Sequence, residues 1–288
     1  MDGVLRGLPF LFVYLDDILV TSPRLDAHIN HIRQLFVRLQ DAGLAINRDK
    51  CVFGAPSVTF LEHSVSSKGI CPLPSKVDAI RSIPRPITMV DLQRFLGCIN
   101  FYHRFLPNIA TILTPFHALT SSAPSQKHVL DWQPEHLLAF SQAKQKLSQA
   151  SMLVHPDPSA VLSLTADVSD VAVGAVLGQG ASQDPLAFFS KKLSPAERKY
   201  CAFDRELLAL YLAVKHFRPH VEGRNFVIYT DRHQGGPTEV HRLHQLLPPL
   251  RAWHRRRPDS EDGPLLGLPS SLGVRQGEVD VVSCHSKK

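Results

Sequence analysis

The sequence lacks the features of a disulfide-rich, secreted or membrane-spanning chain. Its five cysteines are odd in number, lie far apart and include no C-x-x-C pair, which argues against a disulfide framework or a cysteine-rich zinc site. No apolar run reaches the ~18 residues of a membrane span. The opening residues, MDGVLRGLPF, have no basic leader and no small-residue cleavage site. We therefore expect an intracellular protein, cytoplasmic or nuclear, that is not secreted and has no membrane partner.

What the sequence does contain is enough apolar material for a core and a modest excess of positive charge. Hydrophobic residues make up 44% of the 288 residues, and a chain of this length holds about two domains. The formal net charge is +6 and the pI about 9.1. This excess suits a protein that binds a phosphate backbone, but many unrelated proteins are equally basic.

Two adjacent carboxylates, Asp16 and Asp17, lie between apolar runs at 10–14 and 18–20. This pattern predicts a β-hairpin with the aspartates at its turn. Neighbouring carboxylates repel each other, and a divalent metal would relieve that repulsion. The alternative is a solvated turn, because aspartate is common in turns.

A second acidic group comprises Asp167, Glu206 and Asp231. Strand patterns at 161–166, 171–177, 186–190 and 226–230 and a helix beginning at the capping pair Ser194 and Glu197 predict an α/β layout. Acidic residues at strand ends beside a helix can converge on metal ions that promote attack of water on a phosphodiester. Taken singly, Glu206 could pair with Arg205, and Asp231 could cap a turn.

The remaining segments give a coarser outline. Helical spacing is present at 24–43, with Gly43 as the stop, at 88–107, with Thr88 and Asp91 as a capping box, and at 132–147. Residues 58–71 suggest a hairpin, and the proline-rich stretch 72–86 a linker. After Arg232 leucine, proline and arginine alternate without a period, so we expect little regular structure there.

Several strings resemble the reverse transcriptase of gypsy-class LTR retrotransposons. FVYLDDILV looks like the family's Y-x-D-D hairpin, and DAGLAINRDKCVF, FLEHSVSSKGI and LQRFLGCINFYHRFLP follow in the family's order. LTADVSDVAVGAVLGQ, AFFSKKLSPAERKYCAFDRELLALYLAVKHFR and VIYTDRH resemble the ribonuclease H domain of the same Pol polyprotein. The resemblance extends from about residue 1 to residue 231.

The resemblance implies an α/β (α+β) fold in four parts. Residues 1–74 would be a partial reverse-transcriptase palm with the catalytic hairpin and primer grip, and 75–158 a helical thumb and connection. Residues 159–231 would form a ribonuclease H-like domain with a mixed sheet, and 232–288 a divergent, poorly ordered tail. The family's third polymerase carboxylate would precede residue 1, so the chain is expected to be an N-terminally truncated fragment.

The resemblance also assigns the site residues. The catalytic, metal-binding residues for Mg²⁺ or Mn²⁺ would be Asp16, Asp17, Asp167, Glu206 and Asp231. Contacts to an RNA–DNA hybrid or primed RNA template would come from Leu61 and His63 of the primer grip, His103 and Arg104 of the thumb, and Lys191 and Lys192. Ser169 and Asp170 would lie near the substrate. Glu62 stands where the family usually has glycine, and its charge would repel a phosphate backbone.

The family's pattern is lost after His233, where the sequence resembles translation in a shifted reading frame. Asp280 is the one candidate for the fourth ribonuclease H acid. We therefore expect impaired polymerisation and reduced or absent hydrolysis. One alternative is a non-catalytic nucleic-acid-binding remnant. Another is a zinc protein using His28, His31 and Cys51, although that spacing lacks a second ligand pair.

Overall fold

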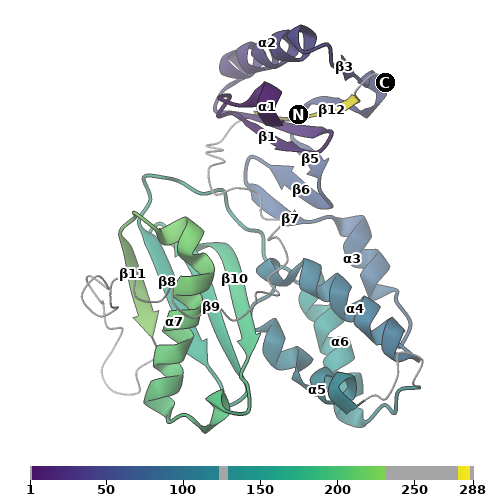
Figure 1. The fold of residues 1–288 in the computed structure, drawn as a ribbon, viewed down its shortest axis with the longest axis vertical. Helices are drawn as coiled ribbons and strands as arrows, with labels where there is room; N and C mark the ends of the chain where they lie inside the picture. Colours follow the sequence, from purple (N-terminus) through teal and green to yellow (C-terminus); the bar gives the residue numbers. More distant parts are fainter. Residues whose placement is uncertain (1, 123–128, 231–277, 286–288) are drawn as a thin grey trace.

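The protein is described by a computed structural model that covers residues 2–122, 129–230 and 278–285. Three sheets follow one another along the chain, and Figure 1 shows them as an upper unit, a small central sheet beside a group of helices, and a second large sheet. Each large sheet has its own buried core. None of the helices in the described ranges is long and apolar enough to cross a membrane.

The upper unit contains the hairpin predicted around the paired aspartates. Strands β1 (Leu11–Tyr14) and β2 (Asp17–Ser22) are antiparallel, with Tyr14 opposite Asp17. Its other elements are α1 (Asp2–Leu5), α2 (Leu25–Asp41), β3 (Ala45–Ile46), η1 (Arg48–Lys50) and β4 (Val52–Ala55). Helix α2 ends as predicted, because Gly43 adopts a φ of +67° and its amide donates to the Gln40 carbonyl at 3.0 Å.

The C-terminal strand β12 (Glu278–His285) joins the sheet of this upper unit (Figure 1). It runs antiparallel to β2, with Asp280 opposite Val20, and also pairs with β3 and β4. The expectation of little regular structure after Arg232 is therefore wrong for this segment, whose valine-rich sequence favours a strand. Residues 231–277 lie outside the described part. Because β12 is in this sheet, Asp280 does not belong to the ribonuclease H-like sheet.

The central sheet consists of β5 (Ser57–Phe60), β6 (His63–Ser66) and β7 (Gly69–Pro72), all antiparallel. Leu61 and Glu62 form the two-residue turn between β5 and β6, with φ values of +46° and +63°. Two-residue hairpin turns of this kind need positive φ at both positions and prefer glycine or asparagine there. The glycine that the resemblance leads us to expect at position 62 would suit this backbone conformation.

Helices α3 (Pro74–Arg81), α4 (Met89–Phe101), α5 (Ile109–Ser122) and α6 (Pro134–Ser148), with η2 (His103–Phe105), pack against the central sheet. The predicted capping box of Thr88 and Asp91 is confirmed. Helix α3 corrects the reading of 72–86 as a linker. Its Pro74 occupies the first turn, where a missing N–H removes no helical hydrogen bond. Helix α5 was not predicted from the sequence and contains Pro115.

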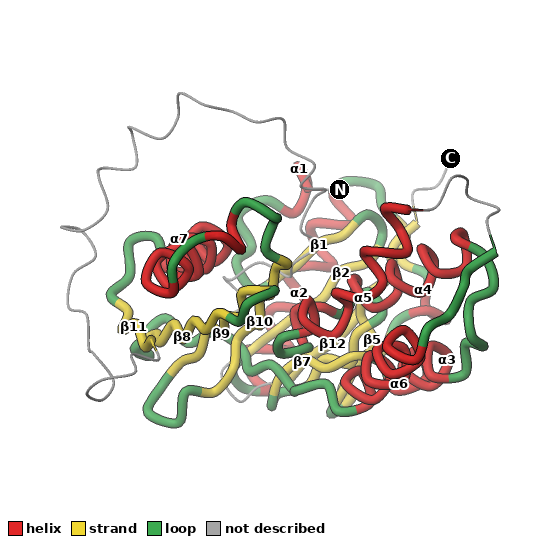
Figure 2. The backbone as a smooth tube through the Cα atoms, turned by 90° about the horizontal axis from the view of Figure 1, so that it is seen from below, coloured by secondary structure: helices red, strands yellow, loops and turns green. Residues whose placement is uncertain are grey.

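The mixed sheet predicted for the ribonuclease H-like unit is confirmed. Its order is β10 (Asp184–Lys192), β9 (Ala172–Gln179), β8 (Leu162–Val168) and β11 (Phe226–Thr230), and β8 and β11 are parallel. Helix α7 (Ala202–Val221) covers one face, as Figure 2 shows with the sheet nearly edge-on. The helix buries Ala209, Ala213 and Phe217 against this face.

The predicted start of this helix is displaced. Ser194 and Glu197 do form the capping pair, because the Ser194 amide donates to Glu197 Oε2 at 2.6 Å. The pair, however, leads into the short turn η3 (Glu197–Lys199), and α7 begins at Ala202. There the Cys201 sulfur accepts from the Asp204 amide at 3.5 Å and caps the helix.

Candidate active site and nucleic-acid interface

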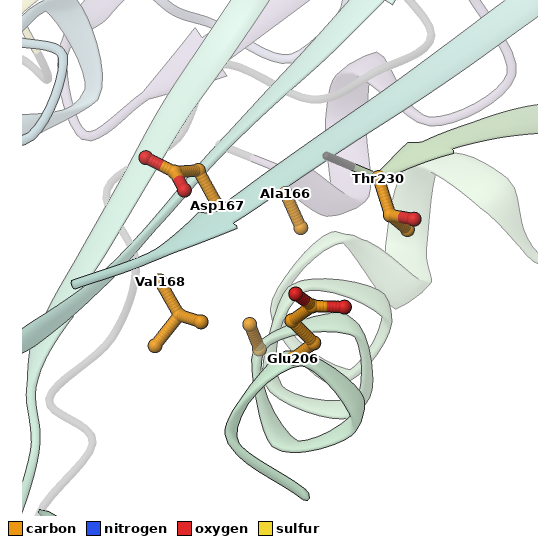
Figure 3. A pocket seen from close by; sticks show the side chains of 6 residues that line it. Ala166, Asp167, Val168, Glu206 and Thr230 are labelled. Carbon is orange, nitrogen blue, oxygen red and sulfur yellow. The ribbon is translucent and has the colours of Figure 1, made fainter. Parts of the chain in front are cut away.

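Two of the three acids predicted for the ribonuclease H-like unit line one small cavity. Asp167 near the end of β8 and Glu206 on α7 border a space of about 30 Å³, together with Thr230 of β11 (Figure 3). Because β8 and β11 are parallel and Thr230 lies opposite Ala166, the ends of both strands meet here. Asp231 directly follows Thr230 but lies outside the described residues.

The two carboxylates approach this cavity from different directions. Alternation along β8 turns Ala166 and Val168 toward α7, and the Asp167 side chain points to the other side (Figure 3). The Glu206 carboxylate points from α7 toward Ala166 and Thr230. Asp167 and Glu206 therefore do not face each other, and the part of the chain that is described contains no group of three potential metal ligands.

Arg205, the possible partner of Glu206, is engaged elsewhere. Its guanidinium forms an ion pair with the exposed Asp170 carboxylate at 2.6 Å. Glu206 has no ion pair within the described ranges, which leaves its carboxylate available to a ligand. The predicted neighbour of the substrate, Asp170, is thus tied to α7.

The predicted polymerase carboxylates lie at the tip of the β1–β2 hairpin, in the other large sheet. Asp16 is exposed and Asp17 half-buried. Leu15 precedes them with a φ of +51° and an exposed side chain. A positive φ at leucine is strained, and such strain is concentrated at functional turns. The hairpin therefore carries both carboxylates at a tight turn, with Asp16 the more exposed of the two.

His63, predicted to contact nucleic acid, is instead part of the core. Its ring packs among Phe101, Tyr102 and Phe105, and its Nδ1 donates to the Leu61 carbonyl. Burial lowers the pKa of the imidazole. This residue is 7% exposed, so it is not on a binding surface. Alternation along β6 turns the His63 side chain inward.

At the turn before His63, the acidic repulsion expected from Glu62 is partly offset by a neighbouring lysine. Leu61 is half-buried at the turn. Glu62 forms an ion pair with Lys76 at 2.6 Å, which offsets the negative charge expected to repel a phosphate. The turn is therefore not simply an acidic surface.

Arg104, the predicted thumb contact, points into the protein. Burial lowers the pKa of its guanidinium, which lies over the Phe105 ring at 5.4 Å from the centroid. Its Nε is buried without a hydrogen-bond partner. The pKa of His220 on α7 is lowered mainly by burial and, to a smaller extent, by the positive charge of Arg104. Arg104 thus lies between the helices and α7 and not on an open phosphate-binding face.

The other predicted backbone contacts do converge. His103, Lys191 and Lys192 line a cavity of about 340 Å³ between α4, α5 and β10. His117 and Ser190, which the sequence reading did not single out, line it as well. No local signal marks them, because the cavity forms from residues 96–117 and 190–192, which lie far apart in the chain.

The residues of the zinc alternative have other contacts. The Ser22 hydroxyl lies 2.8 Å from His28 Nδ1 and 2.7 Å from His31 Nδ1. The His31 ring stacks on Phe10 at 3.8 Å, and Cys51 Sγ donates to the Asn47 carbonyl at 3.1 Å. Packing and hydrogen bonding therefore account for these side chains.

Comparison with known proteins agrees with both halves of this architecture. Residues 1–65 match the family described as reverse transcriptase (RNA-dependent DNA polymerase), and residues 132–228 match the RNase H-like domain found in reverse transcriptase. The chain carries reverse-transcriptase and ribonuclease H-like domains related to those of transposon Pol polyproteins.

Curated relatives of this Pol-related chain include the retrovirus-related Pol polyprotein from transposon 297 of Drosophila melanogaster. The two are 37% identical over 261 residues, which is 89% of this chain and 24% of that polyprotein. The transposon Tf2-3 polyprotein of Schizosaccharomyces pombe is 34% identical over 223 residues, 76% of this chain and 16% of its own length. The chain thus spans about a quarter or less of these relatives.

The match to the transposon 297 polyprotein also corrects the predicted extent of the resemblance. A match over 89% of this chain is longer than residues 1–231, so it enters the segment that we expected to have diverged completely. The loss of the family's pattern after His233 is therefore less abrupt than the strings alone indicate.

Solved structures share the fold of this Pol-related chain. The foamy viral protease-reverse transcriptase dRH in complex with double-stranded DNA aligns with a TM-score of 0.75 at 24% identity, covering 85% of this chain and 42% of that one. The foamy viral protease-reverse transcriptase in complex with an RNA/DNA hybrid aligns with a TM-score of 0.73 at 24% identity, covering 81% and 32%. At this identity the comparison establishes the fold.

Proposed function

We propose that this chain is a reverse transcriptase/ribonuclease H segment of the gypsy class that binds an RNA–DNA hybrid or a primed RNA template. The observation that carries the proposal is the pairing of Asp167 and Glu206 around one cavity of the ribonuclease H-like unit. The ammonium groups of Lys191 and Lys192, which line the cavity between α4, α5 and β10 together with His103, supply attraction for a phosphate backbone. The gypsy class rests on the strings quoted above.

The carboxylates of this unit are chemically suited to a hard divalent cation, although Asp167 and Glu206 do not face each other in the structure. Carboxylate oxygens of Asp167 and Glu206, with that of the adjacent Asp231, are the ligands that Mg²⁺ or Mn²⁺ prefers. Asp16 and Asp17 offer the same kind of donor at the hairpin tip. When bound, such an ion would activate water and stabilise charge on a phosphodiester. The protein's part is to hold Glu206 on the rigid helix α7 and Asp167 on β8.

DNA synthesis is not expected of residues 1–288 taken alone. The hairpin supplies two carboxylates, and the third of the family's polymerase acids matches no residue of the sequence. Two of three ligands would not fix a pair of metal ions. Purified protein should therefore incorporate no labelled nucleotide on a primed RNA template, and clear incorporation would contradict this.

Hydrolysis of the RNA strand tests the acid site directly. In magnesium we expect slow or no cleavage of a labelled RNA–DNA hybrid, because Asp167 and Glu206 do not face each other. Asp167→Asn is the matched control, since it removes the charge and keeps the shape. Efficient cleavage by the natural chain that Asp167→Asn abolishes would show that the site is intact.

The orientation of the two carboxylates favours a second candidate, a binding remnant without catalysis. Such a protein would bind hybrid equally well in EDTA and in magnesium and would leave the RNA strand intact. Binding that requires magnesium would argue against it, because the metal would then be part of the hybrid site.

A further inference from the structure

The cavity between α4, α5 and β10 is chemically unlike the acid site. Its titratable lining comprises His103, His117, Lys191 and Lys192, and no acidic side chain lines it in the described part of the chain. Figure 1 shows β10 as the strand of its sheet nearest the helices. The cavity thus combines a volume of about 340 Å³ with two lysines of β10 and with histidines of η2 and α5.

The cationic groups are not fully neutralised by the protein. Lys191 Nζ lies 3.3 Å from Glu197 Oε1. Lys192 is half-buried and has no acidic partner within the described ranges. Partial desolvation and then the charge of Lys192 lower the pKa of His117, which places the ammonium close to that ring. A half-buried ammonium without a counter-ion favours an anionic ligand.

Neutral donors complete the polar wall. The Ser190 hydroxyl accepts from the Ala110 amide at 3.1 Å, so its own hydrogen can be donated to a ligand. His103 Nδ1 donates to the Asn100 carbonyl at 2.8 Å, which holds this ring in the lining of the cavity. The apolar part of the lining comprises Leu96, Ile109 and Leu113.

From this arrangement we infer that the cavity binds the phosphate of a nucleotide, with its sugar and base against the apolar part of the lining. Ligand cavities of small molecules begin at about 300 Å³, so the volume suits one nucleotide unit. The site goes beyond the proposed function, because a free nucleotide would occupy it even if the chain bound no hybrid. A nucleotide within a strand carries the same phosphate chemistry.

The sheet register relates this cavity to the acid site. Ser190 and Asp167 both lie opposite Gly174, one on each side of β9. Two strand spacings separate them, or about 10 Å. A single nucleic-acid strand could therefore reach both places, whereas a free mononucleotide would occupy one.

The test uses the full chain and calorimetric titration with AMP, with adenosine as the ligand that lacks the phosphate. AMP should bind and adenosine should bind at least about tenfold more weakly. Lys192→Gln should weaken AMP binding about tenfold, Lys192→Arg should restore most of it, and Lys199→Gln, at an exposed lysine of η3, should leave it unchanged. Circular dichroism of each variant shows whether it folds.

A second titration, with a 5′-phosphorylated single-stranded oligonucleotide, distinguishes a free nucleotide from a nucleotide within a strand as the source of the phosphate. If AMP displaces the oligonucleotide, both ligands occupy the cavity. If the oligonucleotide binds but AMP does not, and Lys192→Gln weakens that binding, the site belongs to a nucleic-acid strand. The inference is overturned if a folded Lys192→Gln variant binds AMP and the oligonucleotide as the natural chain does, or if adenosine binds as well as AMP. AMP binding to this cavity does not require cleavage of a hybrid at the acid site, so failure of AMP binding is distinct from failure of hydrolysis.

Discussion

At the scale of single residues, the turn at Leu61 and Glu62 holds a side chain in a backbone conformation that suits glycine. Glu62 has a φ of +63° and also pairs with Lys76. Glu62→Gly and Glu62→Ala both remove the ion pair, but Ala keeps the unfavourable φ. We expect the Gly variant to be more stable than the Ala variant by about 1 kcal/mol in denaturant unfolding. An Ala variant of equal or greater stability would contradict the assigned turn.

His63 makes stability depend on pH. Burial lowers the pKa of this ring below its ordinary value of 6.5, so the unfolded chain binds a proton more readily than the folded chain. The free energy of unfolding should therefore fall as pH drops below about 6.5, by at most about 1.4 kcal/mol per pH unit for one histidine. His155 and His220 also have lowered pKa values through burial and contribute in the same direction.

His63→Phe isolates the contribution of this ring. Phenylalanine fits among Phe101, Tyr102 and Phe105 and does not titrate. Urea unfolding of this variant between pH 7.5 and 5.5 should show a shallower loss of stability than the natural chain. An unchanged slope would mean that His63 does not stay neutral in the folded protein.

Individual residue types were predictable from the sequence where the chemistry is local. The adjacent Asp16 and Asp17 between apolar runs gave the hairpin, and Asp167 at a strand end gave its place beside Glu206. The inward direction of His63 and Arg104 was not predictable from composition, because it depends on aromatic residues from α4 and η2 that pack over them.

At the scale of elements, the same capping signal had two outcomes. Thr88 and Asp91 cap an α-helix, but Ser194 and Glu197 cap a single turn that ends at Tyr200. Cys201 then caps the N-terminus of α7, which begins at Ala202. The existence of most strands and helices followed from periodicity. Helix α3 was missed because the proline-rich stretch 72–86 indicated a linker. Helix α5, which contains Pro115, was not predicted.

Strand β12 is the element whose placement the sequence could not predict, since its partners are more than 200 residues away. Val281 lies opposite Leu19 of β2 and Val52 of β4, so β12 is a central strand. Its backbone N–H groups alternately face both neighbours. Val281→Pro should remove a ladder hydrogen bond and destabilise this sheet.

Hydrogen exchange measured by mass spectrometry checks the placement of β12. Amides of β2 should exchange faster in Val281→Pro than in the natural chain, while Val281→Thr, which keeps the amide and a β-branched side chain, should change them little. Unchanged protection of β2 in the proline variant would show that β12 does not pair there.

At the scale of the whole molecule, the ribonuclease H-like sheet and the segment that leads into it make close contacts with the preceding parts of the chain. The Leu153 amide donates to the Ile70 carbonyl at 2.9 Å, and His155 Nε2 donates to the Ser66 carbonyl at 2.7 Å. The Asn108 side chain packs directly on Gly174, where an added Cβ would overlap its oxygen. Sequence patterns predict each unit separately, but these contacts arise between residues that no local pattern links.

A double-mutant cycle tests the contact between Asn108 and Gly174. Gly174→Ala should destabilise the protein by about 1–2 kcal/mol through overpacking. Adding Asn108→Gly removes the opposing side chain at a position whose φ is +54°, which glycine accepts. In the Asn108→Gly background, Gly174→Ala should therefore cost clearly less in thermal unfolding, and additive effects would contradict the contact.

The most direct test of hybrid binding by this Pol-related chain is hydrogen exchange of the full protein with and without an RNA–DNA hybrid, in EDTA. Binding through the hairpin and the basic cavity predicts protection of peptides containing Leu15–Asp17 and Ser190–Lys192, weakening as salt rises. A hybrid that leaves both segments unprotected at low salt, or protects other segments alone, would contradict the account.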